Sequence, residues 1–493
     1  MCTIELLIRL PLPSQNSLSP SPTSVETRKN MSYINEIPPE ILATVFEISI
    51  YTSGISALRP LSVVCQHWHD IVEQTPRLWG IILLHKHSSP EALQRQITKA
   101  KAAPLSITID PGTRSSKRTA NVFQQLSALS RNWVMATVGT DFISSSLWVN
   151  LHRSLEELAL RRANPAHNEP SLFFDGVDAL SKRETRTRSF TATGLPKAWI
   201  VGFLGPSILQ FRLVNGFCDF VDQSTWSSRP YSRISDTWDY LSRIPNVVNV
   251  HLKHLRHNDP RGSALSPVRL SKLENLHVED VLRVPILLSS IAAPSLQTLV
   301  IDRRRTRKDP WGFVFPEYAP MAPFFARWSE PAFLPSNLHT LQLWDCLEVA
   351  DVPYLIRWLG RLPNLVRLII GDESNVLRDA PSRLSLDEGE NNLYKALAAP
   401  ISRGDGSLFW LCPSLMILHL EADHHITDLL PIASARGGIT PTPHHGIPPP
   451  NRLRRIEALL CNTGEKEQID LLSSLVDQAY CICTTCGLHG MSF

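Results

Sequence analysis

Residues 363–370 read Pro-Asn-Leu-Val-Arg-Leu-Ile-Ile, and the pattern that they carry recurs along most of the chain. Its apolar positions are Leu365, Leu368 and Ile370, spaced by three residues and then by two. The spacing of two is typical of a short strand with one buried face. The same spacing begins at nine places, namely Leu155, Ile208, Val247, Leu273, Leu296, Leu338, Leu365, Leu415 and Leu453. We therefore expect a series of similar strands.

Five of the nine copies follow directly on Pro-Ser or Pro-Asn, and helix-like segments precede some of them, as at 236–244 and 351–362. A helix, a proline and an apolar strand in repetition are typical of a leucine-rich solenoid, whose units stack because one unit cannot cover its own apolar side. The copies start 23 to 53 residues apart. The position eight residues after the first apolar residue usually carries Asn or Cys in such repeats; Cys346 and Cys461 fit this rule, whereas Gly216, Arg304 and Glu373 at the same position do not. We therefore predict an α/β fold that contains an irregular leucine-rich-repeat-like solenoid with parallel strands. The alternative is a general α/β domain in which the spacing arises by chance.

The segment 34–84 has a different pattern, that of a few short helices. Pro38 and Pro39 suit the first turn of a helix, where a missing N–H costs nothing. Apolar residues follow at helical spacing, and a second helix carries its own apolar stripe. About fifty residues cannot bury this much apolar surface among themselves. We expect the remainder to contact the rest of the chain or a partner.

This all-α segment resembles an F-box of the large fungal families. The resemblance is carried, in order, by Ile37-Pro38-Pro39-Glu40-Ile41-Leu42, Val45-Phe46, Leu61-Ser62-x-Val64-Cys65-x-x-Trp68 and Pro76-x-Leu78-Trp79. It covers about fifty of the 493 residues, and it departs from the family at Ile37, where Leu is usual, and in 51–60, which lacks the usual acidic residue. The alternative is an ordinary helical hairpin with a core tryptophan.

The resemblance implies that the segment packs against the Skp-type adaptor of a cullin–RING ubiquitin ligase. The adaptor-binding residues that it implies are Ile37, Pro38, Ile41, Leu42, Val45, Leu61, Val64 and Trp68. The chain would then be a substrate-recognition subunit without catalytic residues, in which the solenoid binds a target protein. Two alternatives remain open: an F-box scaffold that does not promote degradation, and a nucleic-acid-associated protein that uses Arg-rich loops.

We expect four regions along the chain. They are a disordered N-terminal tail at 1–30, the F-box at 31–84, the solenoid at 85–462, and a capping helix with a cysteine-containing tail at 463–493. Within the solenoid we expect a helix from Pro90, a strand from Leu105 to Ile109, and long loops at 163–197, 303–317, 372–390 and 424–450. The capping helix is predicted over 465–479.

Composition excludes several classes of function. The formal net charge is only +3, which is too small to imply binding to nucleic acid or to an anionic membrane. No apolar run is long enough to span a bilayer, so we expect no membrane. The nine cysteines are odd in number and scattered, which indicates reduced thiols and a cytoplasmic or nuclear location.

Motifs for catalysis or cofactors are not found. The sequence lacks G-x-S-x-G, a phosphate-binding glycine loop and His-Glu-x-x-His, so we expect neither an enzyme nor a cofactor. Cys481-x-Cys483-x-x-Cys486 with His489 has some character of a zinc site, which needs four ligands. We interpret it as a tail without metal, with zinc as the alternative. The basic run 303–308 is interpreted as a solvated loop, with phosphate binding or nuclear import as alternatives.

Overall fold

The computed structural model divides the chain into two compact units. One comprises Met1–Ile81 with Arg95–Ala103, and the other comprises Ile82–Gln94 with Pro104–Phe493. We call them the helical unit and the strand unit. The structure describes residues 37–84, 88–109, 124–139, 155–161, 186–195, 197–214, 234–255, 266–281, 283–304, 320–371, 392–402, 406–420, 426–437, 449–458 and 466–481.

The helical unit is built from short helices around one apolar core. Its elements are α2 (Pro39–Ser53), the 3-10 helix η1 (Ile55–Ala57), α3 (Leu58–Ser62), α4 (Gln66–Gln74) and α5 (Pro76–Trp79). Pro39 begins α2 and Glu40 lies in its first turn, where a carboxylate is favoured by the helix dipole. The core contains Leu42, Ala43, Phe46, Ile50, Leu58, Ile71, Val72, Leu78 and Ile81.

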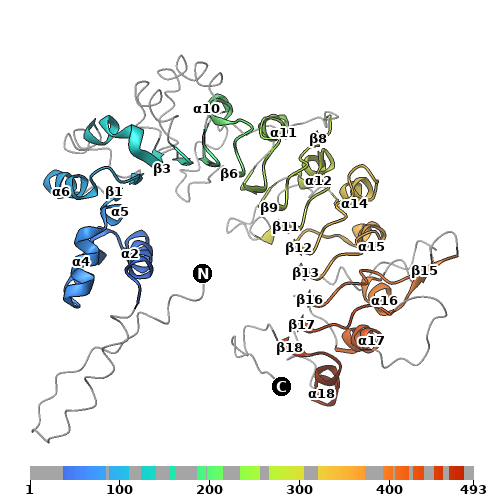
Figure 1. Cartoon of the computed structure of the whole chain (residues 1–493). Helices are drawn as coiled ribbons and strands as arrows, with labels where there is room; N and C mark the ends of the chain where they lie inside the picture. Colours follow the sequence, from blue (N-terminus) through green and yellow to red (C-terminus); the bar gives the residue numbers. More distant parts are fainter. Residues whose placement is uncertain are drawn as a thin grey trace, which may run out of the picture. The chain divides into compact units, whose positions relative to one another are not determined.

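The strand unit is organised by one long sheet (Figure 1). Among the described residues the sheet has 14 strands in the order β1-β2-β3-β4-β5-β6-β7-β9-β11-β12-β13-β16-β17-β18. From β2 to β18 every neighbouring pair is parallel. The strands are β1 (Ile81–Leu84), β2 (Leu105–Ile109), β3 (Trp133–Gly139), β4 (Glu157–Arg161), β5 (Ser189–Thr193), β6 (Gln210–Val214), β7 (Asn249–Lys253), β9 (Asn275–Glu279), β11 (Thr298–Asp302), β12 (Thr340–Trp344), β13 (Arg367–Gly371), β16 (Ile417–Leu420), β17 (Arg455–Ala458) and β18 (Gln478–Cys481).

The repeated sequence pattern sets the register of this sheet. All nine copies form strands, namely β4, β6, β7, β9, β11, β12, β13, β16 and β17. Equivalent positions are Cα partners across the sheet, as with Leu276 and Leu299, then Leu299 and Leu341. Their side chains are buried, whereas the residues between them are mostly half-buried or exposed. The mixed α/β fold with a long parallel sheet is therefore confirmed, and it is compatible with a solenoid.

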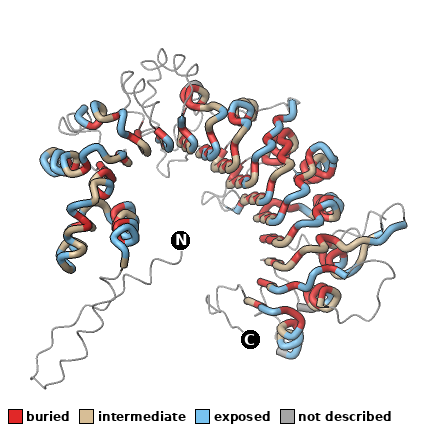
Figure 2. Tube along the Cα trace, viewed as in Figure 1, coloured by how far each residue is buried: buried red, intermediate tan, exposed pale blue. Residues whose placement is uncertain are grey.

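Helices line one side of the sheet (Figure 1). In the strand unit they are α10 (Lys197–Phe203), α11 (Ile234–Ser242), α12 (Val284–Ser289), α14 (Ala322–Trp328), α15 (Val352–Leu359), α16 (Leu393–Ala398), α17 (Ile426–Arg436) and α18 (Lys466–Leu475), with the 3-10 helices η3 (Ser130–Asn132) and η7 (Val349–Asp351). The helix α6 (Pro90–Ala100) is divided between the two units. Two short pairs lie outside the sheet: β8 (Val268–Arg269) with β10 (Ile291–Ala292), and β14 (Ile401–Ser402) with β15 (Leu408–Phe409). Buried residues lie where helices and strands face each other (Figure 2).

Three segments differ from the sequence prediction. The predicted loop 424–450 contains α17, whose Leu429, Ile432 and Ala433 are buried. The flanking Gly, Pro and His residues indicate a loop, so the short apolar face between them was not recognised as a helix. The predicted loop 163–197 contains β5, whose buried side is only Phe190 and Ala192. The predicted helix 465–479 ends at Leu475, and the chain then forms β18. The tail 1–30, the Cys483 and Cys486 positions and most of the other predicted loops lie outside the described residues.

Candidate partner-binding surfaces

Helix α2 has an apolar stripe that the described residues of its unit leave largely exposed. Ile41, Val45 and Ile48 are 55%, 48% and 38% exposed, and their spacing of four and three residues places them on one side of the helix. We call these three residues the α2 stripe. The core residues Leu42 and Phe46 are at most 3% exposed. A helix that is apolar both toward its core and away from it is typical of a helix buried on both sides.

A third side of α2, which carries Thr44 and Glu47, contacts α5. Arg77 donates a hydrogen bond to the Thr44 hydroxyl at 3.3 Å, and its guanidinium lies 3.7 Å from the Glu47 carboxylate. At about 100° per residue, Thr44 and Glu47 lie between the core side and the α2 stripe. Among the described residues, the stripe is therefore the side of α2 that neither the core nor α5 covers.

The remaining predicted adaptor-binding residues occupy different positions. Val64, in the turn between α3 and α4, is 54% exposed, and its neighbour Val63 is 78% exposed. Pro38 is exposed, whereas Ile37, Leu61 and Trp68 are partly buried against the unit's core. Leu42 lies inside that core and is only 3% exposed.

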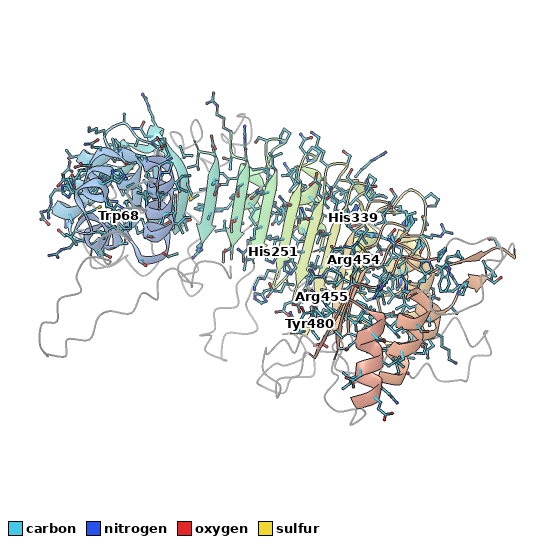
Figure 3. All side chains as sticks on the ribbon, turned by 60° about the horizontal axis from the view of Figure 1, so that its bottom comes forward. Trp68, His251, His339, Arg454, Arg455 and Tyr480 are labelled. Atoms are coloured by element: carbon cyan, nitrogen blue, oxygen red, sulfur yellow. The ribbon has the colours of Figure 1, made fainter. Side chains whose placement is uncertain are left out.

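Trp68, labelled in Figure 3, is partly buried and packs against the core of the helical unit. Its ring meets that of Phe46 edge to face, with centroids 5.0 Å apart. Its indole Nε1 is buried and has no hydrogen-bond partner among the described residues. A buried indole N–H usually has a partner, so this donor is an exception to the rule.

The strand unit offers a second surface, the face of the sheet away from its helices, which we call the strand face. It carries the residues that alternate with the buried apolar ones, for example His251, His277 and Gln342. Aromatic and charged groups gather on the part of the strand face that runs from β11 to β18. The ring centroids of Trp344 and His419 lie 5.4 Å apart, and the Arg304 guanidinium carbon lies 4.1 Å from the centroid of the Trp344 ring. The guanidinium carbon of Arg455 lies 4.5 Å from the centroid of the Tyr480 ring, and both residues are labelled in Figure 3.

The carboxylates of this cluster are held ionised by their neighbours. Burial alone raises the pKa of Glu457, but hydrogen bonding from His419 and the charge and hydrogen bond of Arg455 outweigh it and hold this pKa below its usual value. The same balance applies at Asp302, where burial raises the pKa and Arg304 lowers it to a greater extent. Each of these carboxylates has an arginine two residues away on the same strand or just after it, so this end of the strand face is a mixed-charge surface with aromatic rings.

A second group on the strand face contains two histidines and one glutamate. His251 of β7 and His277 of β9 are Cα partners, and their rings stack with centroids 4.3 Å apart. Glu279 lies two residues beyond His277, and its Oε2 is 3.6 Å from Nε2 of His251. Their ligand atoms all lie within 4.8 Å of one another, so the group has the composition of a metal site. Sequence reasoning did not find it, because its members come from strands whose register only the fold reveals.

Two further findings bear on the functional classes considered above. Among the described residues, no helix has the length and apolar character that crossing a membrane requires. The basic run 303–308 begins with two residues that the protein itself engages. Arg303 is 2% exposed and contacts Met321, and Arg304 pairs with Asp302 at 2.7 Å. The rest of that run lies outside the described residues.

Comparison with known proteins adds little to these observations. No family model and no curated protein sequence matches the chain. Among solved structures, the crystal structure of a complex of Rad7 and Elc1 in yeast resembles the chain at 11% sequence identity and a TM-score of 0.36, over 92% of this chain and 90% of that chain. A likeness this weak supports no argument about fold or function.

Proposed function

We propose that the chain is a substrate-recognition subunit of an SCF-type ubiquitin ligase. In this proposal the helical unit binds a Skp-type adaptor, and through it a cullin, while the strand unit binds a target protein. The chain itself has no catalytic role. The proposal also keeps the leucine-rich-repeat interpretation of the strand unit, for which the parallel register of the nine repeated strands is the support.

The observation that carries the proposal is the α2 stripe. Its three aliphatic side chains lie along one side of α2, each is more than a third exposed, and all three belong to the sequence that resembles an F-box. Covering one Ile or Val side chain fully is worth about 1.5–3 kcal/mol. A partner that covers the stripe therefore gains several kcal/mol of binding free energy. The exposed Val63 and Val64 add apolar surface in the same unit.

Recruitment by such a subunit requires position rather than chemistry. A target held beside the charged conjugating enzyme presents its lysines at a high effective concentration, which accelerates transfer without any catalytic group on the receptor. The absence of catalytic motifs in the sequence agrees with this role. Two features of the strand face support target binding: the described helices of the strand unit lie on the other side of the sheet, and the face carries aromatic rings and both signs of charge.

The test is binding of purified Skp-type adaptor to the full chain and to an Ile41→Glu, Val45→Glu variant. Glutamate retains helix propensity, and both positions are exposed. The free energy of unfolding of the variant should therefore lie within about 1 kcal/mol of the parent's value. Two lost aliphatic contacts should weaken adaptor binding at least about a hundredfold. Calorimetry or surface-based binding measures this loss.

The matched control is Thr44→Glu, which adds the same side chain on the flank of α2 beside Arg77. It should change adaptor affinity by no more than about threefold, because a substitution at an exposed site outside the interface typically changes the free energy by only a few tenths of a kcal/mol. Full adaptor affinity in a folded Ile41→Glu, Val45→Glu variant would contradict the proposal, as would an unaltered chain that fails to bind the adaptor. Ubiquitylation of a bound target in the reconstituted ligase distinguishes a degradative receptor from a scaffold.

A further inference from the structure

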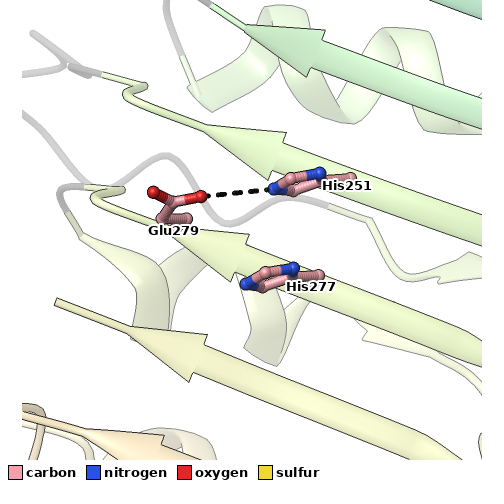
Figure 4. A group of neighbouring side chains, drawn as sticks. All are labelled: His251, His277 and Glu279. Carbon is pink, nitrogen blue, oxygen red and sulfur yellow. Dashed lines mark ion pairs between the residues drawn. The ribbon is translucent and has the colours of Figure 1, made fainter. Parts of the chain in front are cut away.

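The strand face brings together three potential metal ligands that no sequence motif connects. His251 projects from β7, and His277 and Glu279 project from the adjacent strand β9, all from the same side of the sheet (Figure 4). The two imidazole planes are tilted by only 1° at a centroid distance of 4.3 Å. Because parallel pairing fixes the distance between the two strands, the spacing of these ligands is set by the backbone rather than by a loop.

A neutral imidazole offers a metal ion the lone pair of one ring nitrogen. Nε2 of His251 is buried without a hydrogen-bond partner among the described residues, which is costly for a polar atom unless something binds it.

The carboxylate of Glu279 is oriented toward the same point. Lys253 donates to Oε1 at 2.5 Å, and Oε2 faces His251. Hydrogen bonding of one carboxylate oxygen while the other meets the ion is common around metal sites. Lys253 and Arg212 place positive charge nearby and oppose a cation, whereas Glu279 and Asp302 place negative charge there and favour one.

We propose that His251, His277 and Glu279 bind one divalent transition-metal ion, with Zn²⁺ as the best match to the donor set. Two imidazoles and one carboxylate are a common Zn²⁺ ligand set, in sites that keep a fourth position open. For both lone pairs to reach one ion, the rings turn out of their parallel stack about the side-chain torsions. The ion would then cross-link β7 to β9 and leave its fourth position directed away from the sheet.

This site is independent of adaptor binding by the helical unit. Its open position lies on the strand face, so a ligand from solvent or from a bound target can complete the coordination shell. The ion also holds two adjacent strands together, which stabilises the folded chain according to the ratio of free ion to dissociation constant.

The test uses the full chain with Cys481, Cys483 and Cys486 replaced by Ser, so that these thiols do not take up the ion. Titration with Zn²⁺ alone, followed calorimetrically, should show one saturable equivalent. His277→Ala should weaken that equivalent at least about a hundredfold, because even an indirect partner of a ligand is worth 10–100-fold. Zn²⁺ should also raise the unfolding temperature of the parent and not that of His277→Ala.

Two further variants keep the result interpretable. Glu279→Gln preserves the shape of the side chain and should likewise lose the equivalent, even if His277→Ala is poorly folded. His419→Ala removes another half-buried histidine from the strand face and should bind as the parent does. A parent that takes up no Zn²⁺, or uptake that survives in folded Glu279→Gln and His277→Ala, would overturn the proposal.

Discussion

At the scale of single residues, the strand unit contains a buried arginine that bonds to three backbone carbonyls. Arg436, in the last turn of α17, is 2% exposed and donates to the backbone carbonyls of Leu411, Cys412 and Leu397 at 2.5, 3.2 and 3.4 Å. Burial lowers its pKa to about 10, which leaves it charged at pH 7, and burial raises the pKa of the Cys412 thiol to about 12. The cation is therefore compensated by carbonyl dipoles, which it in turn satisfies.

We expect Arg436→Met to destabilise the chain although it conserves length. The substitution leaves buried carbonyls without a donor, and the loss should be about 2–4 kcal/mol in the free energy of unfolding. Urea denaturation measures it. Lys395→Met, at an exposed position of α16, is the control and should change stability by about 0.5 kcal/mol or less. Equal stability of both variants would show that the arginine's hydrogen bonds contribute nothing net.

Glu457 gives a prediction about pH. Its pKa in the folded chain lies below its usual value of 4.5, so the folded state binds a proton less readily than the unfolded state. The stability that the carboxylate contributes is thus present above about pH 4.5 and disappears as the pH falls through the lower folded pKa. Glu457→Gln should cost roughly 1–3 kcal/mol near neutral pH, through its lost contacts with His419 and Arg455. The stability difference from the parent should shrink toward zero in acid; a difference independent of pH would contradict this account.

At the scale of elements, sequence spacing predicted strands better than it predicted which helix positions face outward. Each copy of the repeated pattern became a strand because its apolar residues share one side, and that requirement also fixes the parallel register. In α2, by contrast, Ile41 and Leu42 look equally apolar in the sequence, yet the first is 55% exposed and the second 3%. Only the packing of α2 against its neighbours decides which of them a partner can reach.

The segments that sequence reasoning missed share a physical cause. α17 contains Pro431 in its interior and is flanked by Gly, Pro and His residues, which indicate a loop, but the contacts of Leu429 and Ile432 with the core outweigh that preference. The pair His251 and His277 lies 26 residues apart in the sequence and meets only through the strand register. Local pattern predicts what a segment is, whereas contacts between segments depend on the whole sheet.

At the scale of the whole molecule, the long sheet of the strand unit behaves as a one-dimensional array. Each central strand pairs with two neighbours and packs beside their helices, and equivalent buried positions repeat from one to the next. Stability of such an array is approximately a sum of unit and nearest-neighbour terms. Damage at one strand should therefore spread to the adjacent strands and fade beyond them, rather than weaken the sheet uniformly.

Leu341→Ala tests this expectation at β12, where the leucine is fully buried between Leu299 of β11 and Leu368 of β13. The lost side chain should cost about 2–5 kcal/mol locally. Amide hydrogen exchange in β11, β12 and β13 should accelerate about thirtyfold or more, while β5 and β6 should change far less. Gln342→Ala alters the next residue, on the strand face, and should leave exchange close to that of the parent. Acceleration of the same size in β5 and β6 would mean that the sheet opens as a single cooperative body, and the array description would then be wrong.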